Sequence, residues 1–191
     1  MFSAPVSFGK KIHIIDCPIK NNRTGKFEFA SFVKFDCADY SDIEEVKKAD
    51  GHWRFKNPIL LKMKNVFETK DVFTPSYSFY AIENTQNEIV GLAQTKDCGG
   101  DLVLDFIESS PKQKYKFVGQ NMVAALCKIA LENNFKRLYV PNPIDSAHDF
   151  YTKKCSFKDT KDKSSLALSR FGMRRLLKNF SKMFENLPKN I

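Results

Sequence analysis

The sequence predicts a mixed α/β fold (α+β) in which a mostly antiparallel sheet is flanked by helices, and three observations predict it. Between Tyr77 and Glu108, three apolar segments are separated by short polar turns, which predicts an antiparallel meander. Residues 115–133 then carry apolar side chains at helical spacing, and residues 136–140 read as a strand again. A strand, a crossover helix and a second strand form a parallel pair, so the sheet is mixed.

The remaining elements are predicted from turn signals and periodicity. Residues 11–17 read as a strand ended by Pro18, and alternation predicts another strand at 27–35. Ser41 precedes a segment with an acidic start and a basic end, typical of a helix, and Gly51 ends it. The other expected elements are short helices near 58–67 and at 146–154, a short strand around 166–168, and an amphipathic C-terminal helix at 171–187.

Composition limits the class of protein. The 191 residues suit one domain spanning 1–191, with an N-terminal extension at 1–26 and the C-terminal helix at 171–191. No apolar run reaches the roughly 20 residues that cross a bilayer, and no signal-peptide pattern opens the chain. The five widely spaced cysteines include no Cys-x-x-Cys, and the histidines lack metal-ligand spacing, so we expect a cytoplasmic protein with reduced thiols and no metal.

A basic strand-to-helix turn at 106–126 is the segment most indicative of chemistry. The start of a helix presents unpaired N–H groups and the positive end of its dipole, which together bind phosphate. Gly119 lets the backbone approach a ligand closely, and Lys112, Lys114 and Lys116 add positive charge. The pattern indicates a pyrophosphate site, with an ordinary helix start as the alternative explanation.

The chain carries three motifs in the order EIVGLAQ at 88–94, KFVGQN at 116–121 and SAHDFYTKKCSFK at 146–158. Together they resemble the GNAT superfamily of N-acetyltransferases. EIVGLAQ at 88–94 is similar to a strand in which the family often carries Val-Gly, and KFVGQN at 116–121 is similar to its pyrophosphate loop, Gln/Arg-x-x-Gly-x-Gly/Ala. SAHDFYTKKCSFK at 146–158 resembles its late helix and strand, Ala-x-x-Phe-Tyr-x-x-x-Gly-Phe. The chain departs from these patterns at Lys116, Asn121 and Ser156, and the stretch 151–157 is one residue longer, which indicates a divergent member.

The resemblance implies the GNAT fold, acetyl-CoA (CoA) as cofactor, and direct transfer of its acetyl group to a primary amine without an acyl-enzyme. Carried over residue by residue, it assigns cofactor contacts to Ile107, Lys116, Phe117, Val118, Gly119, Gln120 and Asn121.

The same resemblance supplies candidates for proton transfer. Tyr151 matches a tyrosine whose hydroxyl protonates the leaving thiolate; a packed tyrosine is the alternative. Our candidate for the base is Glu108, with Asp105 second. Both lie, together with Asp101, on the strand before the loop, and the alternative is that they are solvated carboxylates without a catalytic role. Strict alternation places Asp101 and Asp105 on one face and Glu108 on the other, and a bulge would change this.

Two other functions stay open beside acetyl transfer to a protein, a small amine or an aminoacyl-tRNA. One is a non-catalytic CoA-binding or interaction module with this fold. The other is a protein that engages RNA, which the net charge of +9 and the cations of the C-terminal helix motivate. The explanation we favour for that helix is packing of its apolar stripe on its own sheet or on a second subunit, a homodimer, with the cations in solvent.

Overall fold

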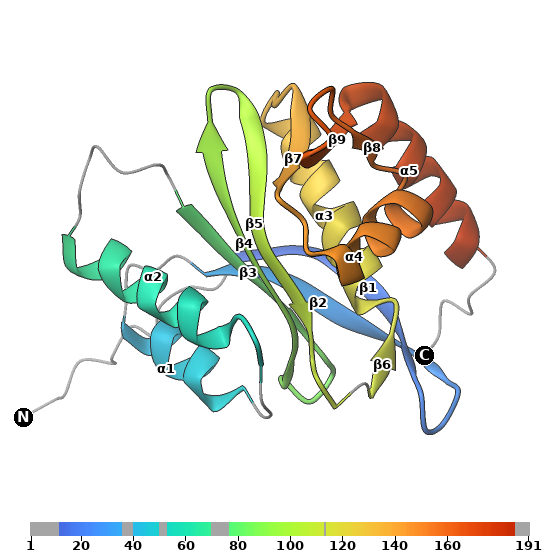
Figure 1. The fold of residues 1–191 in the computed structure, drawn as a ribbon. Helices are drawn as coiled ribbons and strands as arrows, with labels where there is room; N and C mark the ends of the chain where they lie inside the picture. The colour runs from blue at the N-terminus through green and yellow to red at the C-terminus, as the bar shows by residue number, and fades with distance from the viewer. Residues whose placement is uncertain (1–11, 36–39, 50–52, 70–76, 113, 186–191) are drawn as a thin grey trace, which may run out of the picture.

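A computed structural model describes residues 12–35, 40–49, 53–69, 77–112 and 114–185 (Figure 1). Over these residues one nine-stranded sheet has the strand order β6-β1-β2-β3-β4-β5-β7-β9-β8. Only the β5–β7 pair is parallel; the other paired neighbours are antiparallel. The predicted mixed, mostly antiparallel sheet flanked by helices is confirmed.

The strands are β1 (Ile12–Asn21), β2 (Phe27–Phe35), β3 (Tyr77–Glu83), β4 (Ile89–Cys98), β5 (Asp101–Ser109), β6 (Tyr115–Lys116), β7 (Arg137–Pro141), β8 (Lys158–Asp159) and β9 (Ser165–Ser169). The helices are α1 (Tyr40–Lys48), α2 (Lys56–Thr69), α3 (Val118–Glu132), α4 (Asp145–Asp149), the π-helical turn η1 (Phe150–Lys154) and α5 (Arg170–Phe184). Gly51, expected to end the first helix, lies outside the described residues.

Helices cover both faces of the sheet, and each face has its own core (Figure 1). On one face α3 and α5 pack on the strands around Met122, Leu126 and Met173. On the other face α1 and α2 pack around Val46 and Met63. The strands in the middle of the sheet are therefore buried on both faces, which explains their nearly continuous apolar sequences.

The prediction that Pro18 ends the first strand is wrong. Pro18 pairs with Phe29 inside β1, and β6 continues the sheet beyond β1 only at Lys20 and Asn21. Proline is tolerated at such an edge because no neighbouring strand needs its missing N–H. Its carbonyl is used instead, since it accepts a hydrogen bond of 2.7 Å from the Asn121 side-chain amide.

The crossover helix begins at Val118 and not at the predicted Tyr115. Tyr115 and Lys116 form β6, which pairs with the end of β1, and the Tyr115 hydroxyl accepts a hydrogen bond from Asn84. Phe117 then adopts a left-handed backbone, with φ of 69°, before the first helical residue. Tertiary pairing to β1 thus overrides the helical periodicity at these residues.

The short helix predicted at 146–154 consists of two parts. α4 is an ordinary helix, and η1 continues it as a π-helical turn. A π turn accommodates one more residue than an α turn. The stretch from Tyr151 to Phe157 is one residue longer than the family pattern, and this turn accounts for the extra residue.

Candidate functional site

A β-bulge in β5 sets the directions of the side chains at the site. The register with β4 shifts between the Gln94–Phe106 and Thr95–Leu104 pairs, which leaves Asp105 as the extra residue. Leu104 and Ile107 consequently both face the core under α3. The carboxylates of Asp105 and Glu108, which alternation alone puts on opposite faces, therefore lie on the same face, toward α2.

Asp105 is oriented by two neighbours on β4. The Lys96 ammonium lies 3.0 Å from one of its oxygens, and the Gln94 amide donates to the other at 3.3 Å. Partial burial is the largest single effect and lowers the pKa of Lys96, but the hydrogen bond to Asp105 and the charge interactions with Asp105, Tyr77 and Cys98 together outweigh it and raise the pKa. Gln94 is 1% exposed, and its side-chain oxygen has no partner among the described residues.

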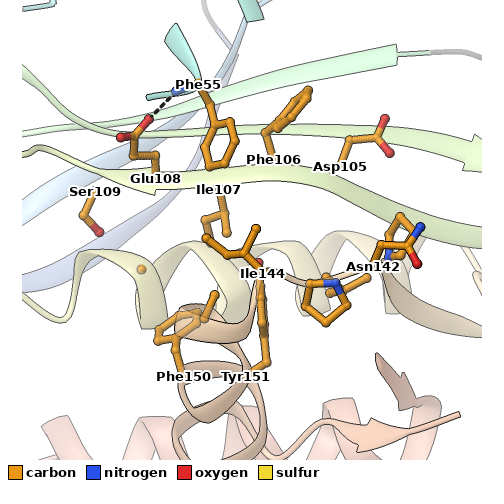
Figure 2. A pocket seen from close by; sticks show the side chains of 15 residues that line it. Phe55, Asp105, Phe106, Ile107, Glu108, Ser109, Asn142, Ile144, Phe150 and Tyr151 are labelled. Carbon is orange, nitrogen blue, oxygen red and sulfur yellow. Dashed lines mark hydrogen bonds between the residues drawn. The ribbon is translucent and has the colours of Figure 1, made fainter. Parts of the chain in front are cut away.

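Glu108 ties β5 to the start of α2. Its two oxygens accept hydrogen bonds from the backbone N–H groups of Arg54, at 2.7 Å, and Phe55, at 2.8 Å. The first helical hydrogen bond of α2 runs from Ile59 N–H to the Phe55 carbonyl. Glu108 is thus an anionic cap at the positive end of this helix. Figure 2 shows one of these hydrogen bonds as a dashed line from Glu108 toward Phe55.

The β5 and β7 strands separate beyond their first two paired residues and leave a cavity between them. Pairing covers Leu102–Leu138 and Val103–Tyr139, after which β5 runs on to Ser109. The cavity has a volume of about 300 Å³. Residues from four segments line it, among them Asp105, Ile107, Gly119, Asn142, Phe150 and Tyr151 (Figure 2).

The start of α3 borders this cavity and offers free backbone donors. Asn121 N–H makes the first intrahelical hydrogen bond, to the Phe117 carbonyl, so the N–H groups of Val118, Gly119 and Gln120 have no acceptor in the helix. The first turn of α3 contains no acidic residue that would repel an anion. A Cβ added at Gly119 would lie 3.1 Å from the Phe150 ring and 3.6 Å from the Ser109 hydroxyl. Only glycine fits this junction without displacing the Phe150 ring.

Of the seven residues assigned to the cofactor, the structure places Ile107 and Gly119 on the cavity. Lys116 is exposed on β6, Val118 is buried, and Gln120 is half-buried in the first turn of α3. The rings of Phe117 and Phe27 stack with centroids 6.1 Å apart.

The Asn121 side chain turns into the protein. Its amide donates hydrogen bonds to the carbonyls of Pro18, at 2.7 Å, and Phe117, at 3.0 Å. The extra bulk of this side chain, where the family usually has a small residue, is therefore directed at β1 and not at the free N–H groups.

Tyr151 lies in the wall of the cavity and is 5% exposed. Its ring packs edge-on against Phe150 and Phe157, with centroids 5.2 Å and 5.4 Å away. In Figure 2 its side chain extends from η1 toward Ile144 and β5. Burial, with a smaller contribution from Cys155, raises the pKa of the Tyr151 phenol above its ordinary value, so the phenol keeps its proton at neutral pH.

Sequence reasoning missed two parts of the cavity wall. Phe55 and Phe106 pack with ring centroids 5.0 Å apart on the α2 side, and Asn142 follows β7 with a left-handed backbone, φ 42°. Phe55 and Asn142 lie in connections without periodicity, so only the folded structure brings them to β5. The positive φ at Asn142 is consistent with the tolerance of asparagine for that region.

Two other kinds of site receive no support from the described part of the chain. No group of three His, Cys, Asp or Glu side chains there gathers closely enough to hold a metal ion. None of its helices combines the length and the apolar character needed to span a membrane.

Comparison with known proteins gives a match in structure only. No family model and no curated protein sequence matches the chain. The KacTA–DNA complex shares 13% identity and a TM-score of 0.57, covering 78% of this chain and 99% of that one. The AtaTR structure with AcCoA bound shares 13% identity and a TM-score of 0.56, covering 77% and 97%.

A third similar structure is a GNAT-family protein. A GNAT-family acetyltransferase from Staphylococcus aureus Mu50 shares 15% identity and a TM-score of 0.50, covering 69% of this chain and 86% of that one. This match agrees with the motifs in the sequence, and so do the order of elements, the bulge in β5 and the separation of β5 from β7. The chain therefore has the GNAT fold.

Proposed function

We propose that this chain is an acetyl-CoA-dependent N-acetyltransferase that moves an acetyl group to a primary amine by direct attack. One observation carries the proposal. A single cavity joins the bulged strand with Asp105, the start of α3 at Gly119, and the buried phenol of Tyr151. The transfer requires a site that binds the phosphates of the cofactor, a base for the proton of the amine and an acid for the leaving thiolate, and these three features can supply them.

The start of α3 suits the pyrophosphate of CoA. Three consecutive N–H groups, at Val118, Gly119 and Gln120, lack helical acceptors, and the helix dipole adds positive potential at the same point. The edges of β5 and β7 beyond Val103 no longer pair with each other, so their backbone groups are available to the amides of a pantetheine chain. The AtaTR structure, which shares the fold, has AcCoA bound, and this supports acetyl-CoA as the ligand.

When bound, acetyl-CoA supplies an activated thioester carbonyl. Tyr151 is our candidate for the acid that protonates the departing thiolate, because its phenol lies on the cavity and keeps its proton at neutral pH, so it is available to the sulfur as negative charge develops there.

Asp105 is our candidate for the base that accepts a proton from the acceptor amine, directly or through a water. It lies on the cavity, toward α2, and Lys96 and Gln94 fix its orientation. Glu108, the candidate we preferred on sequence, has both oxygens engaged by backbone N–H groups, so we assign it the support of α2. The acceptor would then approach from the α2 face.

The test is binding of acetyl-CoA by calorimetry, followed by release of CoA thiol in the presence of amines of several classes. We expect the parent to bind acetyl-CoA and Gly119→Trp to lose binding while remaining folded, because the added ring stands at the edge of the cavity beside the free N–H groups; displacing the Phe150 ring should lower its melting temperature. Lys128→Trp, at a half-buried position further along α3, controls for the added ring. Undiminished affinity in a folded Gly119→Trp variant would refute the placement. Binding without transfer to any amine would identify a non-catalytic CoA-binding module instead.

A further inference from the structure

The C-terminal helix α5 has two faces with different partners. Its apolar face packs within the chain on α3, β7 and β9, with Met173 and Leu176 buried and Leu177 and Phe180 partly buried. Ser169 caps the helix by accepting a hydrogen bond from Gly172 N–H at 3.2 Å. The packing predicted for this helix is confirmed, so its apolar face cannot serve an external partner.

The opposite face carries positive charge. Its exposed cations, which we call the basic stripe, are Arg174, Arg175, Lys178 and Lys182. At about 100° per residue they fall within roughly 100° of the helix circumference, opposite Met173 and Leu176. The stripe is therefore a coherent surface and not a scatter of lysines.

This charge is not neutralised within the described residues. Among the residues that the structure describes, no ion pair involves the basic stripe. No acidic residue occurs in α5. Arg174, Lys178 and Lys182 are spaced four residues apart, an arrangement of like charges that destabilises a helix. A polyanion bound along the helix would relieve this repulsion.

An exposed aromatic side chain accompanies the stripe. Phe171 is 75% exposed, and it lies three and four residues before Arg174 and Arg175, so it falls within the same sector of the helix. Proteins that bind single-stranded nucleic acid combine exposed aromatic rings with a row of cations. The unpaired bases stack on the rings, and the phosphates of the nucleic-acid backbone contact the cations.

From this arrangement we infer that the exposed face of α5 binds a single-stranded nucleic acid, with phosphates along the basic stripe and a base on Phe171. The length from Phe171 to Lys182 is about 16 Å, enough for a few nucleotides. An anionic membrane is the weaker alternative, because a membrane-bound amphipathic helix needs its apolar face free, and that of α5 is buried in the core. The inference is independent of acetyl transfer.

The experiment measures fluorescence anisotropy of labelled U12 RNA and dT12 DNA with the full-length protein between 50 and 200 mM salt. With up to four phosphates neutralised on a single strand, we expect a slope of log affinity against log salt of about −2 to −3, which is a loss of about 15- to 60-fold over this range. Because the expected contacts are to phosphates and a base face, the two oligomers should bind alike. A blunt duplex should bind more weakly, since its bases are stacked on one another.

Three variants separate the contributions. Arg174→Gln with Lys178→Gln should weaken binding and reduce the slope by about 1.4. Phe171→Ala should weaken binding about fivefold or more with an unchanged slope, since it removes stacking and no charge. The control Lys48→Gln with Lys64→Gln removes the same charge from exposed positions on α1 and α2, across the sheet, and should leave both quantities unchanged. Melting temperatures confirm that each variant is folded.

Several outcomes would overturn the inference. If the control pair weakens binding as much as the stripe pair, the binding follows net charge alone. If Phe171→Ala binds U12 like the parent, or if polyglutamate competes as well as U12 at equal charge, the partner is an acidic surface without bases. Binding to vesicles with anionic phosphatidylserine but not to U12 would favour a membrane.

Discussion

Replacing Glu108 by alanine tests the strongest structural assignment at the site. In the parent, its carboxylate accepts the N–H groups of Arg54 and Phe55 and caps the positive end of α2. Glu108→Ala removes both acceptors and the negative charge, while it leaves β5 and its bulge intact. We expect the variant to fold and to be markedly less stable than the parent.

The magnitude follows from the three interactions. The N–H of Phe55 is part-buried, and losing its acceptor costs about 1–3 kcal/mol, whereas the exposed N–H of Arg54 finds water and contributes about 0.5–1 kcal/mol. The anion at the start of α2 contributes a further 0.3–1 kcal/mol, roughly. The expected loss is about 2–5 kcal/mol, or about 4–20 °C in melting temperature for a domain of this size.

Urea unfolding followed by circular dichroism measures this loss. Asp101→Ala is the matched control, because it removes a carboxylate from the same strand whose partner, Arg137 at 2.8 Å, is partly solvent-exposed. Such a pair contributes about 1 kcal/mol or less. Glu108 does not cap α2 if Glu108→Ala unfolds at the same urea concentration as the parent, or if the two variants lose equal stability.

Two further predictions concern proton donors. Tyr151→Phe should lower the rate of acetyl transfer about 100-fold or more while the affinity for acetyl-CoA stays unchanged, because only the leaving-group proton is lost; transfer at the parent rate would show a packing residue. Burial raises the pKa of Cys17 and of Cys155 to about 12. A thiol reagent at pH 8 should therefore modify the exposed Cys98 rapidly, and Cys17 and Cys155 only on unfolding. Cys37, which lies outside the described residues, is replaced by serine in this experiment so that it does not contribute to the signal. The pKa of the Cys17 and Cys155 thiols is higher in the folded protein than the value of about 8.5 in the unfolded chain. Their contribution to stability is therefore complete below about pH 8.5 and is lost as the pH rises toward 12. Melting temperatures of the parent and of Cys17→Ala across this pH range would show the loss.

The order of elements could be predicted because each regular segment carries its own period. The meander of β3, β4 and β5 is bounded by polar or glycine turns, and α3 has an apolar stripe that packs as expected. Errors occurred where a tertiary contact outweighed the local pattern. Pro18 remains within β1 because the sheet ends beside it, and Tyr115 joins β6 because β1 offers a partner.

The site was less predictable, because its geometry depends on three departures from regular structure. Asp105 is the extra residue of a bulge, Phe117 has a left-handed backbone, and η1 is a π turn. Periodicity does not indicate them, because the bulge and the π turn each add a residue to the pattern and the left-handed backbone at Phe117 comes before the helix begins. Strict alternation separates Asp105 from Glu108, and the bulge brings the two carboxylates to one face.

These three departures meet at one cavity, and this convergence is itself an argument for function. The bulge turns Asp105 toward α2, and Phe117 precedes the start of α3, where Gly119 lines the cavity. η1 brings Phe150 against Gly119 and places Tyr151 in the cavity wall. Each departure interrupts regular hydrogen bonding or strains the backbone, so stability alone gives no reason to place all three around one space. Bulges and π turns are frequent at functional sites because they redirect side chains without changing the fold. Deleting one residue from η1, for example, should therefore lower the affinity for acetyl-CoA or the rate of transfer strongly, while the melting temperature falls only slightly.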